Sequence, residues 1–373
     1  MSVRHLYVHL PFCRHRCGYC DFVTVVGRDG EHDRYVDALL RELEIEGGVV
    51  AADVETIFFG GGTPTLLEPA ALARLFASLP PAEEVTVEAN PETVTPELAA
   101  LLRKGGVTRV SLGAQSFTPR LLEVLERAAQ PDDVRAAFYA LRDAGFDHIS
   151  LDLIYGIPGQ SPTDLDRDLG EALELGPDHL SCYELEAKPG TRFTHTYGDE
   201  LEHQAEAMEG YFEQVVERLT SAGYRWYETA NFCRAGAPER APDFRSCHNL
   251  AYWLGRDYLG LGVGAVSTLG STRRRNLPAL PRYMAALEAG ESPPRQLEEL
   301  DAETRRRERI MLGLRLDEPL ALVGLDAEVD HVALERLERL GLAAVTGRSP
   351  ARTLELTTRG RFLGGGVTAE LLA

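Results

Sequence analysis

Six short apolar segments, each followed by a polar, helix-like stretch, constrain the fold of this chain more than any other sequence feature. The segments are residues 4–9, 55–59, 84–89, 108–113, 148–154 and 179–185. Helix N-caps are expected at Thr95-Pro96, at Thr118-Pro119 and at Ser161-Pro162, where Asp164 completes a capping box. Strands that alternate with helices form a parallel sheet, and six such units are too few for a closed eight-stranded barrel. The sequence therefore predicts an α/β fold built on a partial (β/α)6 barrel.

The chain divides into three predicted parts. We expect the partial barrel over residues 1–200, a linking region over 201–292 and a C-terminal module over 295–373. The module has a helix at 302–315, a second helix at 329–340 and a hairpin at 342–357, an order typical of a winged-helix α+β module. Residues 295–373 hold 12 Arg against 14 Asp and Glu, so a packing or lid role is favoured over DNA binding.

Charge and hydropathy exclude several classes of function. The net charge of −19 argues against a protein that grips nucleic-acid phosphates, so we expect no nucleic-acid partner. No apolar stretch approaches the roughly 18 residues of a membrane span, and the N-terminus has no signal-peptide pattern. We therefore expect a cytoplasmic protein without an integral membrane segment, and peripheral association with a membrane stays open.

Three of the six cysteines lie close together, and they indicate metal binding. Cys13, Cys17 and Cys20 form a C-x3-C-x2-C pattern just after the first predicted strand. A structural zinc site needs four ligands, and the chain has no second C-x2-C pair. A [4Fe–4S] cluster held by only three cysteines leaves one iron open, and S-adenosylmethionine (SAM) can fill that position with its amino and carboxylate groups. We therefore predict a [4Fe–4S] cluster on these three thiols.

The surroundings of the cysteines carry a family resemblance. Tyr7-Val8-His9-Leu10-Pro11-Phe12 leads into Cys13, and Gly60-Gly61-Gly62-Thr63-Pro64 follows the second strand. These motifs resemble the radical SAM superfamily, in the branch that contains the oxygen-independent coproporphyrinogen III oxidases (HemN) and the heme chaperones (HemW). The resemblance runs over essentially the whole chain. It implies a radical SAM barrel, bound SAM and an electron donor that reduces the cluster, so that SAM yields a 5′-deoxyadenosyl radical.

The resemblance also implies a set of SAM-contacting residues. Gly61 and Gly62 allow a ligand to approach the backbone closely, and a carboxylate such as Asp152, set among leucines, is costly to bury without a partner. Arg127 can clamp a carboxylate with two hydrogen bonds, although surface arginines are common in this chain. The positions that match SAM contacts in the superfamily are Tyr7, Tyr19, Gly61, Gly62, Thr63, Glu88, Gln115, Arg127 and Asp152.

Two features favour the chaperone over the oxidase. Members of the oxidase type carry a further cysteine two residues after the third, and this chain has Phe22 there. The segment His248-Asn249-Leu250-Ala251-Tyr252-Trp253 resembles the H-N-x-x-Y-W heme motif of the chaperones. His248 offers an axial nitrogen to heme iron, Asn249 belongs to the motif, and Tyr252 and Trp253 offer a flat apolar surface. Cys247 is the alternative axial ligand.

The sequence thus predicts a heme chaperone that uses a [4Fe–4S] cluster and SAM and passes heme to an acceptor protein. The alternatives are an oxygen-independent coproporphyrinogen III oxidase, a radical SAM enzyme that modifies RNA, and a protein whose cluster is structural. Because the heme motif follows the sixth strand, we expect it to face the cluster from outside the sheet. The chain departs from the chaperone pattern at Gly262–Ser267 and Leu125–Ala129, where each segment lacks a histidine.

Overall fold

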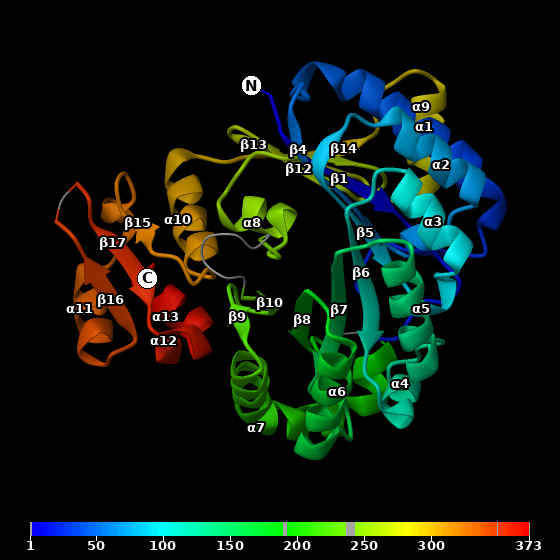
Figure 1. Cartoon of the computed structure of the whole chain (residues 1–373). Helices are drawn as coiled ribbons and strands as arrows, with labels where there is room; N and C mark the ends of the chain where they lie inside the picture. Colours follow the sequence, from blue (N-terminus) through cyan, green and yellow to red (C-terminus); the bar gives the residue numbers. More distant parts are fainter. Residues whose placement is uncertain (1, 189–191, 236–242, 349, 373) are drawn as a thin grey trace.

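The computed structural model describes residues 2–188, 192–235, 243–348 and 350–372, and it is dominated by one curved parallel sheet (Figure 1). Its six central strands are adjacent in the sheet in chain order and parallel to one another. They are β1 (His5–Leu10), β4 (Val54–Gly61), β5 (Ala82–Ala89), β6 (Arg109–Gln115), β7 (His148–Tyr155) and β8 (His179–Glu184). All six coincide with the predicted apolar segments, so the predicted α/β fold with a partial barrel is confirmed.

Three further strands extend this sheet at its edges. β11 (Leu259–Leu261) pairs in parallel with β1, and the antiparallel strands β10 (Asn231–Arg234) and β9 (Tyr224–Trp226) follow β8. None of these three strands is among the six predicted for the barrel. Two-residue strands β2 (Phe12–Cys13) and β3 (Val25–Val26) pair beside the cysteine loop.

Helices cover the outer face of the sheet (Figure 1). They are α1 (His32–Glu46), α2 (Pro69–Ser78), α3 (Pro96–Lys104), α4 (Pro119–Val124), α5 (Pro131–Asp143), α6 (Pro162–Leu175) and α7 (Arg192–Ser221). Short 3₁₀ helices occur at Asp29–Glu31, Gly47–Val49, Pro64–Leu66, Pro91–Thr93 and Asp326–Glu328. Thr95 and Ser161 cap α3 and α6 as predicted, and Asp164 completes the capping box. Thr118 is the N-cap residue of α4 as predicted, but its side chain makes no cap hydrogen bond to that helix.

The rest of the chain forms two smaller units. Near the barrel lie α8 (Cys247–Trp253), α9 (Leu280–Glu288) and an antiparallel sheet of β12 (Val266–Leu269), β13 (Thr272–Asn276) and β14 (Arg295–Glu299). The C-terminal unit contains α10 (Ala302–Gly313), β15 (Leu320–Ala321), α11 (His331–Arg339), β16 (Ala343–Thr346), β17 (Thr353–Leu356), α12 (Thr358–Phe362) and α13 (Gly364–Leu371). The predicted helices and hairpin are present, whereas α12 and α13 were not anticipated.

Separate hydrophobic cores explain why the C-terminal unit is distinct. The main core lies between the curved sheet and its outer helices, and a second core extends from Ile310 to Leu372 within the C-terminal unit. In the part of the chain that is described, no helix is long and apolar enough to cross a membrane.

Candidate functional site

A cavity of about 590 Å³ opens at the carboxyl ends of the parallel strands, where functional loops of α/β sheets gather. The three cysteines of the predicted cluster line it. Eight of the nine residues predicted to contact SAM also line it, namely Tyr19, Gly61, Gly62, Thr63, Glu88, Gln115, Arg127 and Asp152. The structure thus brings together side chains that the sequence spreads over more than a hundred positions.

The cysteine loop is held against the end of β4. The Cys20 N–H donates to the carbonyl of Cys17 at 3.2 Å, and the Cys13 thiol lies 3.7 Å from the Thr63 hydroxyl. All three thiols are free, and burial raises the pKa of Cys13 and Cys20. Thiols in this state need a metal to favour the thiolate form.

The three thiols that line the cavity are the donor type that an iron–sulfur cluster takes. Among the described residues, no three His, Cys, Asp or Glu side chains converge as the ligands of one metal ion would. In an iron–sulfur cubane each cysteine binds a different iron, so the thiols stand around the cluster rather than around one point. The donor set therefore fits a three-cysteine [4Fe–4S] cluster.

The glycine-rich end of β4 leaves room for a ligand beside the backbone. A Cβ on Gly62 would lie 2.7 Å from the carbonyl oxygen of Pro11, and Gly61 has a φ of 116° that side chains rarely adopt. A side chain at Gly61 would also collide with the His9 ring, and one at Gly62 with the backbone of Pro11 and Phe12. The backbone of these two residues therefore forms one wall of the cavity.

Arg127 is arranged to bind an anionic group. Its Nη2 donates to the Asn90 Oδ1 at 2.9 Å and to the Gly113 carbonyl at 3.0 Å. Its Nε is buried and has no hydrogen-bond partner, an expensive state unless a ligand completes it. Asn90 in turn donates to the Thr63 hydroxyl at 3.1 Å. The SAM carboxylate is the group that this cation fits.

Two carboxylates, Glu88 and Asp152, give the cavity acidic groups in addition to the cation Arg127. Burial and the nearby Asp152 raise the pKa of Glu88 to about 7, although the Gly61 N–H donates to its Oε2 at 3.2 Å. Burial also raises the pKa of Asp152, against hydrogen bonds from Ser181 and Ser111. A cation between the two carboxylates would remove their repulsion. The ammonium and sulfonium groups of SAM supply such charge, so the residues present fit this cofactor.

Sequence reasoning missed several polar residues of the cavity. Asn90 joins Thr63 to Arg127, and Ser111 donates to both oxygens of Asp152 at 3.0 Å. Asn90 directly follows the end of β5, which is the position where a parallel sheet places ligand contacts. That signal was available, whereas the role of Ser111 appears only when β6 and β7 are paired.

Tyr7 differs from the other predicted SAM contacts. Its hydroxyl lies 3.0 Å from the His9 Nδ1, and its ring stacks on Phe58 with centroids 6.2 Å apart. Phe58 lines the cavity, but Tyr7 is not among the lining residues. Tyr7 therefore stands behind the wall of the cavity in this structure.

The predicted heme motif forms α8, which packs on the inner face of the sheet and not outside it as expected. The carboxylate of Glu84 accepts from the backbone N–H of Cys247 and of His248, each at 3.0 Å. Side chains of a strand alternate between its faces, so Glu84 points to the same side as Glu88 in β5. Asn249 of the motif and Ser246, the N-cap residue of α8, line the cavity. His248, Tyr252 and Trp253 are not among the lining residues. The motif therefore closes the amino-terminal end of the partial barrel.

Both ring nitrogens of His248 are engaged. Nδ1 lies 2.7 Å from the Thr56 hydroxyl, and Nε2 lies 3.0 Å from the Tyr252 hydroxyl. The residue is 1% exposed, its ring stacks on Phe58, and burial lowers its pKa to about 3. The imidazole is therefore neutral, and it can bind iron only by giving up one of these hydrogen bonds.

The neighbours of His248 are covered unequally. The guanidinium of Arg315 lies over the Trp253 ring at 4.3 Å, and Arg309 donates to the Trp253 carbonyl at 3.1 Å. Tyr252 packs edge-on against Tyr258. Cys247 is exposed, but burial of its thiol and the nearby Glu84 raise its pKa to about 12. The C-terminal unit thus covers Trp253, and Cys247 is the accessible residue of the motif.

Comparisons with known proteins agree with this site. Residues 7–172 match the radical SAM superfamily, the class of protein that the partial barrel and the cysteine loop define. Heme chaperone HemW of Mycobacterium tuberculosis (strain ATCC 25618 / H37Rv) is 38% identical over 379 residues, covering 98% of this chain and 94% of that protein. Heme chaperone HemW of Bacillus subtilis (strain 168) is 35% identical, covering 84% and 83%. The chain belongs to the HemW family.

A solved structure shows the same fold. Coproporphyrinogen III oxidase (HemN) from Escherichia coli, described as a radical SAM enzyme, superimposes with a TM-score of 0.80 over 100% of this chain and 91% of that one. The two sequences are 24% identical. This likeness supports the architecture, whereas the choice between chaperone and oxidase depends on the HemW relatives.

Proposed function

We propose that this protein is a heme chaperone that carries a [4Fe–4S] cluster and SAM, binds heme and transfers it to an acceptor protein. The observation that carries the proposal is the cavity that joins Cys13, Cys17 and Cys20 to the charged pocket of Arg127 and Glu88, in a chain 38% identical to a heme chaperone over nearly its whole length. The reduced cluster, when bound, supplies one electron to SAM.

Each part of the cavity has a distinct task in this proposal. The three cysteine thiolates hold the cluster, and Arg127 with Asn90 holds the SAM carboxylate. Glu88 and Asp152 face the positive groups of SAM, and Gly61 and Gly62 provide backbone contact. Tyr19, Thr63 and Gln115 complete the wall, and Tyr7 supports it through Phe58.

The oxidase alternative is less well supported. Phe22 stands where oxidase-type members have a further cysteine, and it is 62% exposed at the rim of the cavity. Phenylalanine supplies neither a thiol nor a proton, so any step that needs that cysteine is lost. The RNA-modifying alternative requires a basic docking face, and the net charge of −19 opposes it.

We place the heme site on α8, with His248 as the axial ligand and Cys247 as the competing one. A neutral imidazole is a good iron ligand, and its Nε2 is released when the Tyr252 hydroxyl turns away. The raised pKa of Cys247 disfavours its thiolate at neutral pH. Asn249, Tyr252 and Trp253 complete the proposed site.

The proposed partners follow from the chemistry. An electron donor must reduce the cluster, and an acceptor protein must take the heme. We also place the protein in the cytoplasm, since reduced cysteines are maintained there and all six cysteines are free.

The test is anaerobic purification followed by hemin titration and transfer. Protein with its cluster reconstituted should bind about one hemin per chain, from a single axial site, and should pass it to apomyoglobin as the probe acceptor. Omission of SAM and of reductant provides the matched controls. Rapid conversion of coproporphyrinogen III to its divinyl product would instead assign the protein to the oxidases, and failure to bind hemin would contradict the chaperone proposal.

A further inference from the structure

Gln115, at the carboxyl end of β6, has a strained backbone. Its φ is 65°, and the Ser116 N–H donates to the Ala114 carbonyl at 2.8 Å, so a three-residue γ-turn is centred on Gln115. The pairing of β6 with β7 shifts register between Leu112 and Gln115. Side chains rarely adopt such a conformation, and it persists only when the surroundings enforce it.

The Gln115 side chain lies in the cavity wall at this turn. Gln115 is among the lining residues, and its Nε2 lies 2.7 Å from the position of a Cβ on Gly113. The same Gly113 accepts a hydrogen bond from Arg127. Gln115 therefore packs over the strand next to the arginine that is arranged for the SAM carboxylate, on the face where Ser111 and Gly113 of β6 also line the cavity. The strained turn sets the backbone position from which this side chain extends.

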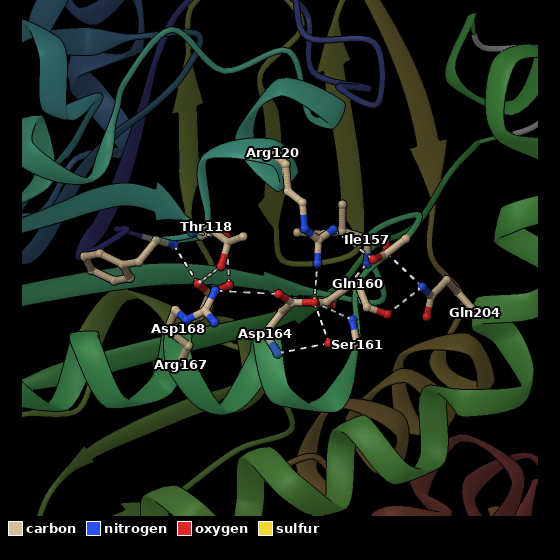
Figure 2. A network of polar contacts seen from close by, with 12 residues as sticks. Thr118, Arg120, Ile157, Gln160, Ser161, Asp164, Arg167, Asp168 and Gln204 are labelled. Carbon is tan, nitrogen blue, oxygen red and sulfur yellow. Dashed lines mark hydrogen bonds and ion pairs between the residues drawn. The ribbon is translucent and has the colours of Figure 1, made fainter.

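Asp168 of α6 holds the three residues that follow the turn (Figure 2). Its carboxylate accepts from the Ser116 hydroxyl at 2.6 Å, from the Phe117 N–H at 2.8 Å and from the Thr118 hydroxyl at 3.1 Å. Asp168 is 1% exposed. The hydroxyl of Thr118, the N-cap residue of α4, is thus bound to Asp168 instead of to the backbone of that helix. A buried carboxylate with three donors is a strong anchor, because losing any donor leaves charge unsolvated.

The helix that carries Asp168 is itself fixed to the neighbouring loop. Asp164, one turn earlier, accepts from the Ser161 N–H at 2.8 Å and pairs with Arg120. Gln160 accepts from the Gly156 N–H at 2.7 Å, and Gln204 of α7 donates to the Gln160 carbonyl at 3.0 Å. Figure 2 shows Arg120, Gln160 and Gln204 around the start of α6. These contacts hold the start of α6, the helix that carries Asp168, in place.

We propose that Asp168 is a positioning residue for SAM: it holds the strained turn that keeps Gln115 in the cofactor cavity. Asp168 does not line the cavity itself, so it acts through Gln115. The inference rests on the proposed function, since it takes the cavity as the SAM site. Nothing in the sequence around Asp168 distinguishes it from the other acidic residues of an exposed helix.

The first test measures the turn without SAM. Asp168→Asn keeps the shape of the side chain but replaces one acceptor with a donor. Hydrogen exchange followed by mass spectrometry should show faster exchange in the peptide that covers residues 114–120 of the cluster-containing protein. Asp166→Asn is the matched control, because Asp166 is an exposed carboxylate of the same helix that pairs with Arg218 of α7. Equal protection of residues 114–120 in Asp168→Asn and wild type would overturn the inference.

The second test measures SAM affinity by equilibrium dialysis. Asp168→Asn should bind SAM about tenfold more weakly, an effect typical of residues coupled in one network, whereas Asp166→Asn should bind it as wild type does. Gln115→Ala should also weaken binding, and adding Asp168→Asn to it should then have no further effect. Additive losses in the double variant would refute action through Gln115. If the wild type itself bound no SAM, the proposed function would fail, while the exchange experiment would still decide the role of Asp168 in the turn.

Discussion

Replacing Glu88 with Gln tests the charge arrangement of the cofactor cavity. The variant keeps the shape of the side chain and an oxygen that can accept from the Gly61 N–H, but it removes the charge that faces Asp152. The other titratable groups that face Glu88 are the hydroxyls of Tyr7, Tyr183 and Tyr252. These phenols stay neutral because their pKa values are raised, so the carboxyl pair dominates.

The expected change in stability follows from the pKa. The pKa of Glu88 rises from 4.5 to about 7 on folding. The folded protein therefore holds this proton more tightly than the unfolded chain does. The contribution of Glu88 to the free energy of unfolding is therefore greatest below pH 4.5, and it is lost as pH rises from 4.5 to about 7. The full shift corresponds to about 3 kcal/mol, and we discount it to roughly 2 kcal/mol because the carboxyl is partly accessible from the cavity.

Glu88→Gln should remove this loss of stability, because glutamine does not ionise. At pH 8, the variant without SAM should melt roughly 4 °C above the wild type, and the difference should shrink towards zero at pH 5. SAM binding should change in the opposite direction: at pH 8 the variant should bind SAM at least tenfold more weakly, because a hydrogen bond to a charged acceptor contributes about 1.5–3 kcal/mol. Wild-type affinity should fall as pH drops below 7, whereas the affinity of the variant should stay level.

Thermal melts by scanning fluorimetry and equilibrium dialysis of SAM, each at several pH values, provide the measurements. Glu92→Gln is a matched control, since Glu92 is another carboxylate that lines the cavity. A melting difference that does not vary with pH, together with unchanged SAM affinity, would refute the reasoning.

Three further predictions concern the cluster and the heme. Cys17→Ala should lose the roughly four irons per chain of the cluster and its charge-transfer absorbance; full retention of iron and sulfide in a variant lacking all three cluster cysteines would contradict the assignment. Because Phe22 replaces a cysteine, wild type with dithionite and SAM should yield little or no decarboxylated coproporphyrinogen III by mass spectrometry, and enzyme-like turnover would show this wrong. Tyr252→Phe should free the Nε2 of His248 and tighten hemin binding severalfold, whereas His248→Ala should shift the Soret band with the cluster spectrum intact; unchanged spectra in His248→Ala combined with Cys247→Ser would exclude both as ligands.

The barrel could be predicted because its signals are local. Each central strand is a short apolar run, and prolines and capping residues mark the start of several helices, as at Thr95 and Ser161. The cysteine loop was equally visible, because its three ligands lie within eight residues. The C-terminal helix α13 was missed because glycine-rich Gly364–Gly366 has low helix propensity, and packing of Val367 and Leu371 in the second core stabilises this helix instead.

The sequence by itself determined the parallel α/β sheet, the cysteine loop and most of the residues that meet in the cavity. Only the tertiary structure decided how polar groups are paired: it engaged both nitrogens of His248, brought α8 to the inner face of the sheet, and used Asp168 to hold the turn at Gln115. The physical reason is the separation in sequence over which each interaction acts. Strand periodicity and metal-ligand spacing act between residues close in sequence, whereas burial and hydrogen-bond pairing depend on partners that folding brings from distant segments.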